Sequence, residues 1–286
     1  MGSLKEIRTR ISSVDSTKQI TSAMKMVSAA KLRKAQDAII HMRPYAEKLE
    51  EILINVSQDT NPNENIYAKE REVKNVLVIP VASNRGLCGA FNANIVKKVL
   101  SLMQNEYKDF NLSFYPIGRK VGELLKSKKV EFDRSNSHIF DHITFEKSAE
   151  IALEIMKDYA DGKYDKIVFI YNKFKNAALQ EVTVEQFLPI QIKKDSTAVL
   201  NDYIYEPEKE TIIHDIIPKS LKTKVFKIIL ETNASEHGAR MTAIHKATDN
   251  AIELGKELLL QYNKARQAAI TNEILEIVGG AEALKS

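Results

Sequence analysis

Residues 241–286 read MTAIHKATDNAIELGKELLLQYNKARQAAITNEILEIVGGAEALKS and form one uninterrupted helical pattern. Apolar residues recur there at steps of three and four, at Ile244, Ala247, Ala251, Leu254, Leu258, Tyr262, Ala265 and Ala269. A second run, Ile270, Ile274, Ile277 and Ala281, continues toward the end of the chain. No proline follows Pro218. The pattern therefore predicts a helix over 219–286, about 100 Å long, with a heptad-like apolar seam.

A helix of that length needs a partner, because a globular chain of this size has a radius of gyration of only about 19 Å. The N-terminal segment offers a matching stripe at Leu4, Ile7, Ile11, Val14, Ile20, Met24 and Val27. Small residues that permit close approach are Ala23, Ala30, Ala35, Ala247, Ala251 and Ala265. We expect the two ends to pair as an antiparallel coiled coil. The alternative is that each helix pairs with a second copy of the chain.

The middle of the chain alternates strand and helix patterns. Apolar or alternating runs predict strands at 76–79, 112–117, 167–171 and 182–192, and helical composition predicts helices at 90–107, 121–126 and 145–159. Such alternation is typical of a parallel-type sheet covered by helices. We expect an α/β fold in three parts: an N-terminal coiled-coil helix at 1–58, an inserted Rossmann-like α/β domain at 73–195, and a C-terminal coiled-coil helix at 207–286.

Composition narrows the function classes. The net charge of the 286 residues is +4, which is too mild to indicate nucleic-acid binding. The single cysteine, Cys88, excludes an intrachain disulfide. No run of about 18 apolar residues indicates a membrane span, and the N-terminus is charged from Lys5, unlike a signal peptide. We therefore expect no direct membrane insertion, so a partner would make any membrane link.

The first predicted strand is followed by Ser83-Asn84-Arg85-Gly86-Leu87-Cys88-Gly89. This turn could present Arg85 and the Cys88 thiol for contact, because its two glycines permit a tight backbone. It could equally be an ordinary turn with a buried, inert cysteine. No phosphate-binding glycine motif is present, so we expect no nucleotide or other cofactor. No histidine lies near Cys88 in the sequence, so Cys88 is a weak candidate for a catalytic nucleophile.

Other polar residues carry weaker signals. His138 and His142 have helical metal-ligand spacing, but Ser135-Asn136-Ser137 before them favours a loop, so we expect no metal site. His237 and His245 are expected to be exposed and without ligands. A basic cluster, Lys25, Lys31, Arg33 and Lys34, is either a solvated face or a contact for acidic loops.

The C-terminal tip is apolar on more than one face, at Ile270, Ile274, Leu275, Ile277, Val278, Ala281 and Leu284. Exposed apolar surface of this kind is normally an aggregation hazard. It is explained if other subunits supply an apolar sleeve around the tip. The alternative is a frayed, disordered end.

Several motifs resemble one known family. They are Lys5-Glu6-Ile7-Arg8, Thr21-Ser22-Ala23-Met24-Lys25-Met26-Val27, Arg85-Gly86-Leu87-Cys88-Gly89, Ser235-Glu236-His237-Gly238-Ala239-Arg240-Met241 and Tyr262-Asn263-Lys264-Ala265-Arg266-Gln267. Together they resemble the gamma subunit of the rotary ATP synthase, over the whole chain and in the same order. The terminal motifs are highly specific, whereas the middle domain matches loosely.

The resemblance implies a non-catalytic rotor of the central stalk, coupling ion flow through a membrane ring of c subunits to ATP synthesis or hydrolysis on beta. It implies partners: three alpha and three beta subunits, an epsilon subunit and the c ring. Residues matching contacts with beta are Met24, Lys25, Arg85, Cys88, Arg240, Gln267 and Thr271. Residues matching a foot on the c ring and epsilon are Tyr203, Tyr205 and Glu206. Ile274, Ile277, Val278 and Leu284 match the tip within the sleeve.

The sequence also departs from the family. His237 and Gly238 stand where alanine or glutamine is frequent, and a glycine weakens a helix by about 1 kcal/mol relative to alanine. Plastid members add a cysteine pair for redox control, which this chain lacks. We therefore expect a bacterial subunit on the cytoplasmic face of the inner membrane. The rivals are a coiled-coil scaffold with an α/β head and an α/β enzyme of flavodoxin-like topology with helical arms.

Overall fold

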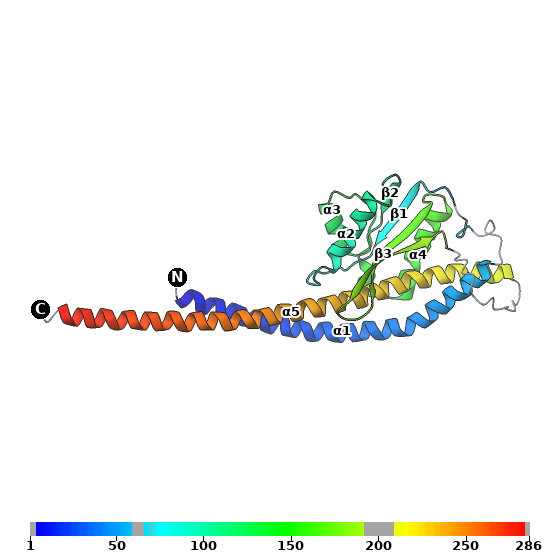
Figure 1. Ribbon diagram of the computed structural model, residues 1–286. Coiled ribbons are helices and arrows are strands. Elements are labelled where there is room, and N and C mark those ends of the chain that lie inside the picture. Colours follow the sequence, from blue (N-terminus) through cyan, green and yellow to red (C-terminus); the bar gives the residue numbers. More distant parts are fainter. Residues whose placement is uncertain (1–3, 59–65, 70, 192–208, 284–286) are drawn as a thin grey trace. The chain divides into compact units, whose positions relative to one another are not determined.

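The computed structural model describes residues 4–58, 66–69, 71–191 and 209–283 (Figure 1). The chain falls into two compact units. Unit 1 comprises residues 1–28 and 241–286, and unit 2 comprises residues 29–240. Two long helices, α1 (Leu4–Gln58) and α5 (Lys209–Ala283), contribute to both units. The predicted α/β fold with long terminal helices is confirmed.

Both long helices contain a proline without being interrupted by it. Pro44 lies inside α1 and Pro218 inside α5. The sequence pattern predicts a helix from residue 219, after Pro218, whereas in the structure α5 already begins at Lys209. Ile217 and Leu221 flank the proline and are buried in the core of unit 2. This packing offsets the hydrogen bond that the proline cannot donate.

Unit 2 contains one sheet of four strands in the order β2-β1-β3-β4. The strands are β1 (Asn75–Pro80), β2 (Asn111–Phe114), β3 (Lys166–Phe174) and β4 (Gln180–Leu188). Each lies where the sequence predicts a strand. β1 is parallel to β2 and β3, but β4 is antiparallel to β3. The short connection from Phe174 to Gln180 explains this difference, because a parallel return needs a long crossover.

Helices cover both faces of the sheet. On one face, α2 (Phe91–Gln104) and α3 (Arg119–Ser127) pack on Val76, Val78, Val168 and Ile170. On the other, α4 (Phe145–Ala160) and the unit 2 part of α5 pack on Leu77, Ile79, Ile167 and Phe169. A 3₁₀ turn, His138–Phe140, precedes α4. All three helices predicted in this region are confirmed.

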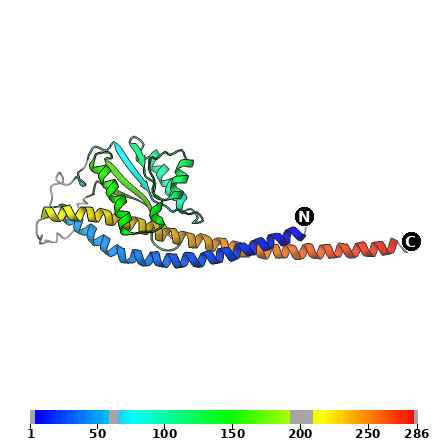
Figure 2. The same cartoon turned by 180° about the vertical axis from the view of Figure 1, so that it is seen from behind.

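Within unit 2, α5 is buried on nearly all sides. Figure 2 shows this part of α5 between the sheet and α1. From Leu221 to Arg240, each of its residues is buried or half-buried. Polar side chains in this stretch must therefore be satisfied within the protein. Ser235 donates to the Asn172 carbonyl at 2.8 Å, and Glu231 binds Arg43 of α1.

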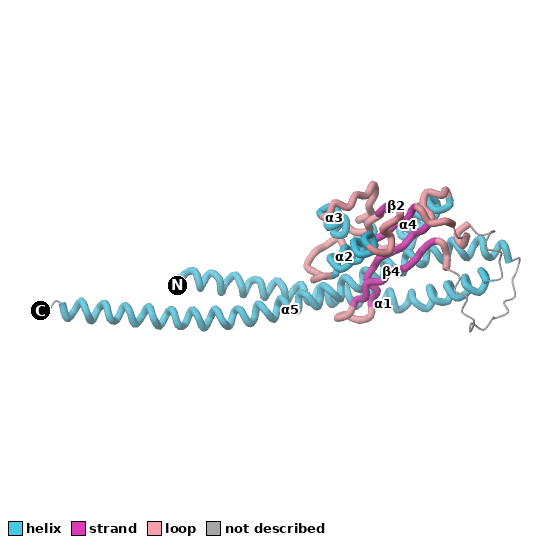
Figure 3. The backbone as a smooth tube through the Cα atoms, turned by 45° about the horizontal axis from the view of Figure 1, so that its top comes forward, coloured by secondary structure: helices cyan, strands magenta, loops and turns pink. Residues whose placement is uncertain are grey.

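Within unit 1, α1 and α5 pair with each other as antiparallel helices (Figure 3). The Lys25 amine lies 3.2 Å from Nδ1 of His245, and Gly255 packs against Val14. The expected pairing of the two chain ends is thus confirmed, and the pairing does not require a second copy.

The seam of unit 1 differs in part from the predicted stripes. On α5 its buried and half-buried positions are Ile244, Thr248, Ala251, Gly255, Leu258, Tyr262, Ala265 and Ala269. Ala247 and Leu254, predicted to lie in the seam, are exposed. The observed positions alternate strictly between steps of four and three, which is the 3.5-residue period that keeps a coiled-coil seam facing its partner.

The same correction applies to α1. Leu4, Ile7, Ile11, Val14 and Met24 are half-buried as predicted, but Ile20, Ala23 and Val27 are exposed. The seam continues instead through polar positions, Lys18, Thr21, Lys25 and Ser28, of which Lys18 is exposed. Of the other small residues, Ala35 is buried and Ala30 exposed in unit 2. Apolar side chains therefore remain on the outer face of α1.

The end of α5 has no helical partner in unit 1. At the register set by Val14 and Gly255, Leu4 lies opposite the stretch around Ala265, and α5 continues past that point (Figure 3). Residues 270–281 are all exposed. Ile274 is 55% exposed and Ile277 is 71% exposed. The predicted second seam through Ile270 and Ala281 therefore packs against nothing within unit 1.

Candidate functional site

The turn between β1 and α2 lies where α/β folds of this kind bind ligands, at the carboxyl ends of the strands where the strand order reverses. In this chain, side-chain and backbone groups of the turn itself bind the backbone amides nearby. The Asn84 side chain accepts from the Arg119 amide at 2.9 Å, and the Ser83 carbonyl accepts from the Lys120 amide at 3.0 Å. The first amides of α3, which could otherwise hold a phosphate, are thus already used.

Close backbone packing reinforces this arrangement. Gly118, the residue before α3, has φ of 111°, and a Cβ there would lie 2.2 Å from the Ala82 carbonyl oxygen. Only glycine fits at this position. At Gly118 the backbone that follows β2 therefore lies directly against the end of β1.

The inner side of the turn is a small buried hydrogen-bond network. The Asn92 side chain accepts from the Ser83 amide at 3.1 Å and donates to the Cys88 sulfur at 3.2 Å. Cys88 is 2% exposed, and burial raises the pKa of its thiol. Its side chain therefore shapes the turn and is not presented at the surface. The outer side carries Arg85 and Leu87, which are exposed.

The side chain of Arg240, on α5, also contacts this turn. Its Nη1 donates to the Gly86 carbonyl at 2.6 Å, and Nη2 donates to the Glu236 carboxylate one helical turn earlier. Both residues are less than 10% exposed. Burial raises the pKa of the Glu236 carboxyl, and the Arg240 guanidinium opposes that shift. The guanidinium that the resemblance assigns to a partner contact is thus engaged inside unit 2.

His237, predicted to be exposed, is instead half-buried, with an Nδ1 atom that is shielded from solvent and has no hydrogen-bond partner among the described residues. Burial, assisted by the charges of Arg240, Lys31 and Arg85, lowers its pKa to about 4. The burial of His237 follows from the close packing of the next residue. Gly238 lies so near the Ala177 backbone that a Cβ on it would be 3.2 Å away. His245 is exposed, as predicted.

The remaining candidates with helical positions lie in unit 1. Lys25 is a half-buried position of the seam, and Met24 beside it is also half-buried. Gln267 and Thr271 are exposed, and the Thr271 hydroxyl donates to the Gln267 carbonyl at 2.9 Å. Ile274, Ile277 and Val278 are exposed near the end of α5. Tyr203, Tyr205, Glu206 and Leu284 lie outside the described residues.

The histidine pair does not form a metal centre. His138 lies in the 3₁₀ turn and is 3.7 Å from the Asp141 carboxylate, while His142 is exposed in the following loop. Across the described ranges, no group of three or more metal-ligating side chains gathers. No helix of the described residues is long and apolar enough to cross a membrane.

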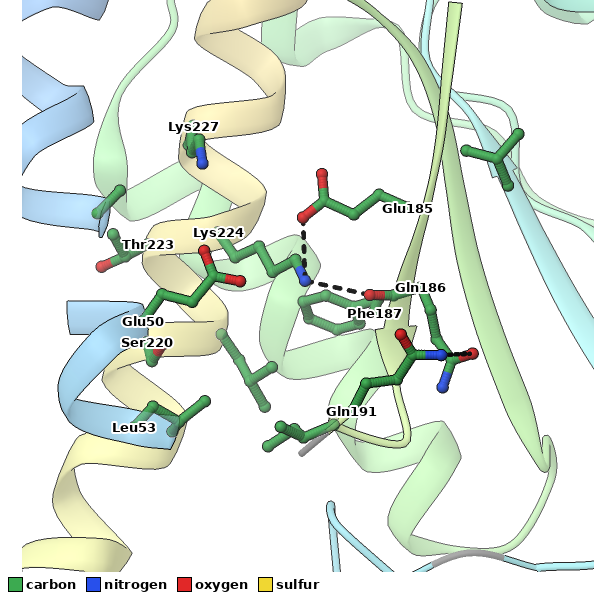
Figure 4. A pocket seen from close by; sticks show the side chains of 14 residues that line it. Glu50, Leu53, Glu185, Gln186, Phe187, Gln191, Ser220, Thr223, Lys224 and Lys227 are labelled. Carbon is green, nitrogen blue, oxygen red and sulfur yellow. Dashed lines mark hydrogen bonds and ion pairs between the residues drawn. The ribbon is translucent and has the colours of Figure 1, made fainter. Parts of the chain in front are cut away.

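A cavity of about 320 Å³ lies between α1, α5 and β4 (Figure 4). Two of its charged residues are paired: the Lys224 amine binds the Glu185 carboxylate at 3.0 Å, and it also donates to the Gln186 carbonyl at 3.1 Å. Lys224 lowers the pKa of Glu185, offsetting the effect of burial. The Thr223 hydroxyl is buried and has no hydrogen-bond partner within the part of the chain that the structure describes. The lining has no arrangement that identifies a ligand, so we assign it none.

Comparison with known proteins decides the family. The family model described as "ATP synthase" matches residues 3–284. The chain is 56% identical to the ATP synthase gamma chain of Christiangramia forsetii over 285 residues, covering 99% of both proteins. It is 57% identical to that of Flavobacterium johnsoniae over 286 residues, again covering 99% of both. The chain belongs to the ATP synthase gamma family. The resemblance seen in the sequence is confirmed.

Solved structures agree with this gamma-family assignment. The chain is similar to a central-stalk chain of the Tetrahymena thermophila mitochondrial ATP synthase, with a TM-score of 0.62, 26% identity, and 80% and 99% of the two chains covered. A chain of the Euglena gracilis mitochondrial enzyme shares the fold, with a TM-score of 0.71, 23% identity, and 98% and 94% covered. A gamma chain is a subunit of the synthase complex and not its catalytic part.

Sequence reasoning missed three residues of this region. Glu236 had a usable signal, since a glutamate four residues before an arginine is a familiar helical pair. Leu87 had none, because nothing in the sequence shows that it adopts a positive φ of 61°. Glu231 had none either, because its partner Arg43 is far away in the sequence.

Proposed function

We propose that this chain transmits torque in the central stalk of an ATP synthase, between a membrane c ring and catalytic sites on beta subunits. The observation that carries this proposal is the unpaired end of α5 in unit 1. Ile274 and Ile277 remain more than half exposed there, and Val278 beside them is 54% exposed. An isolated protein gains nothing from such a surface, whereas an apolar sleeve from other subunits would cover it.

The paired helices of unit 1 suit the same role. Two helices joined along a seam resist bending and twisting better than one. The outer face of α1 keeps Ile20 and Val27 in solvent. A shaft turning within a ring has to make and break contacts with successive subunits. Scattered apolar groups and exposed charges, worth about 0–1 kcal/mol per pair, permit this better than deep interlocking does.

The residue assignments follow the resemblance and the geometry together. We propose that Met24, Lys25, Gln267 and Thr271 contact beta from unit 1, and that Arg85 does so from the turn. Arg85 is exposed and the unit 1 residues are exposed or half-buried, as a contact requires. Cys88 and Arg240 are buried and would act by shaping the turn.

Other parts of the proposal rest on the resemblance alone. Tyr203, Tyr205 and Glu206 form the foot on the c ring and the epsilon subunit. The segments 1–58 and 207–286 form the shaft, and 73–195 forms the inserted domain. The relatives from Christiangramia forsetii and Flavobacterium johnsoniae are bacterial proteins, which supports a location at the cytoplasmic face of a bacterial inner membrane.

The test is co-expression of the chain with the alpha and beta subunits of its own synthase, followed by native mass measurement. We expect a complex with three alpha subunits, three beta subunits and one copy of this chain. Absence of a stoichiometric complex would contradict the rotor proposal.

A matched pair of variants tests the sleeve. Ile274→Asp with Ile277→Asp places charges on the α5 end and should lower the recovery of the complex several-fold. Leu153→Asp places a charge at another apolar residue, 48% exposed on α4, and should leave recovery unchanged. Equal recovery of the complex with the parent chain, with the double variant and with Leu153→Asp would count against the sleeve.

A further inference from the structure

Leu87 is in an unfavourable arrangement that the fold of unit 2 does not explain. Its φ is 61°, in the left-handed region, and its side chain is 72% exposed. A large residue rarely adopts this conformation, which costs free energy relative to glycine. The exposed side chain gains little from the core in return. Strain held at one place in this way is a recurring mark of a binding element.

The peptide groups before Leu87 are held by three donors from different elements. Arg240 of α5 donates to the Gly86 carbonyl at 2.6 Å. The Ser83 hydroxyl donates to the Arg85 carbonyl at 2.6 Å, and the Asn92 amide donates to the same carbonyl at 3.3 Å. Because these carbonyls are fixed, the backbone at Leu87 has little freedom to relax.

Arg240 is the one of the three donors that lies on α5. Its guanidinium is shared between the Gly86 carbonyl and the buried Glu236 carboxylate, so both of its terminal nitrogens have acceptors within unit 2. With Arg240 only 9% exposed, little of it can reach another subunit. Direct contact through this side chain does not fit its position, whereas control of the turn does.

We infer that Arg240 is a positioning residue that holds the turn 84–89 against α5, and that Leu87 is the group that this turn presents to the catalytic head. The inference rests on the proposed function and deepens it. The basic groups near the turn define the partner surface. Arg85 is exposed beside Leu87, and Lys31 acts on the same Glu236 carboxylate as Arg85 and Arg240. A complementary surface has an apolar socket edged by carboxylates.

This arrangement gives Arg240 an effect that depends on Leu87. Removing the guanidinium frees the Gly86 carbonyl, and the strained backbone at Leu87 then relaxes toward a negative φ. The Leu87 side chain would leave its place although its chemistry is unchanged. Arg240→Lys keeps one donor for Gly86 but cannot bind two acceptors with a planar fork, so it should retain part of the effect.

The experiment is a double-mutant cycle in the complete synthase, in membrane vesicles. The variants are Leu87→Ala, Arg240→Ala and their combination. Two quantities are measured at equal amounts of assembled complex: the rate of ATP hydrolysis, and the initial rate of membrane charging reported by a potential-sensitive dye. The dye responds to any coupling ion. Their ratio measures coupling, which a loss of stability alone would not change.

We expect each single variant to lower the coupling ratio by about threefold to tenfold, and the combination to be no worse than the more affected single variant. Arg240→Lys should recover part of the loss. Ser235→Ala is the matched control, because it removes a different buried hydrogen bond between α5 and the domain, to the Asn172 carbonyl at 2.8 Å. It should leave the ratio unchanged.

If the fold-loss of the coupling ratio in the combined variant equals the product of the two single fold-losses, the two residues act independently. That result would overturn the inference and favour direct contact by Arg240. An unchanged ratio in Leu87→Ala would also overturn it, since Leu87 would then not be the docking group. Failure of the parent chain to assemble with alpha and beta would instead contradict the proposed function itself.

Discussion

Arg43 of α1 and Glu231 of α5 form a two-pronged ion pair, with Nε 2.9 Å from Oε1 and Nη2 3.1 Å from Oε2. The Glu231 side chain is fully buried. Both partners also bind the end of β3: Glu231 accepts from the Phe174 amide at 2.8 Å, and Arg43 donates to the Phe174 carbonyl at 2.7 Å. The two long helices and the sheet are therefore joined at one point of unit 2.

The first prediction concerns this joint. Glu231→Ala removes the carboxylate that neutralises the partly buried Arg43 guanidinium and leaves the buried Phe174 amide without its acceptor, so it should destabilise the chain by about 3–5 kcal/mol. Urea unfolding monitored by circular dichroism measures the change. The double variant Arg43→Met with Glu231→Leu removes both charges and should lose much less. A double variant as unstable as Glu231→Ala would show that the charges themselves are needed.

The second prediction contrasts two glycines of α5. Gly255→Ala adds a methyl group 3.7 Å from Val14, an ordinary contact, and should stabilise the chain by about 1 kcal/mol through helix propensity. Gly238→Ala adds the same group 3.2 Å from the Ala177 backbone, so its gain should be cancelled and a net loss of about 1 kcal/mol should result. Urea unfolding measures both changes. If the midpoints of Gly255→Ala and Gly238→Ala shift in the same direction relative to the parent, this prediction is wrong.

The third prediction concerns pH. Burial lowers the pKa of His237 to about 4, whereas an unfolded histidine titrates near 6.5. Between these values the unfolded chain binds a proton that the folded chain does not. The stability that the folded chain gains from keeping His237 neutral is therefore fully present above about pH 6.5 and is lost as the pH falls toward 4. Because the ring is only partly buried, we expect about 1–2 kcal/mol.

The measurement is urea unfolding at pH 7.5 and pH 5 for the parent and two variants. His237→Gln should reduce the loss of stability between the two pH values. His245→Gln replaces an exposed histidine of the same helix and should not. An equal pH dependence in the parent and His237→Gln would rule out this origin.

The fourth prediction concerns Cys88. Because burial both covers its sulfur and raises the pKa of the thiol, alkylation by iodoacetamide at pH 7.5 should be at least about a hundredfold slower in the native chain than in urea. Mass spectrometry of timed samples measures the rate. Rapid labelling of the folded chain would mean that the turn opens readily.

Helix and strand positions were predictable because apolar periodicity reports them directly, as β1 and α4 illustrate. The seam was harder to predict. Apolar character alone places Ile20, Val27 and Leu254 in the seam. In the structure the neighbouring positions Thr21, Ser28 and Gly255 lie there instead, because the 3.5-residue period fixes which positions of a helix face its partner. Extending the 3-4 steps from Leu4 to Val14 would have given the observed α1 positions.

The candidate site was predictable as a turn but not as a mechanism. The glycines around Leu87 marked a tight backbone, and the family motif marked Arg240. Their connection depends on a contact between residues 154 positions apart in the chain, which no local pattern reports. The same is true of Arg43 and Glu231.

The polar middle of the α1 seam has a mechanical consequence. Between Lys18 and Ser28 the seam positions on the α1 side carry hydroxyl and amine groups, with Met24 the one half-buried apolar side chain beside them, whereas Leu4 to Val14 supply apolar contacts. Less hydrophobic burial means less free energy opposing local separation of the two helices. Torsional compliance in unit 1 should therefore concentrate in this stretch. A shaft with one soft section can store part of each step as elastic strain and release it gradually, smoothing motion that its partners drive in discrete jumps.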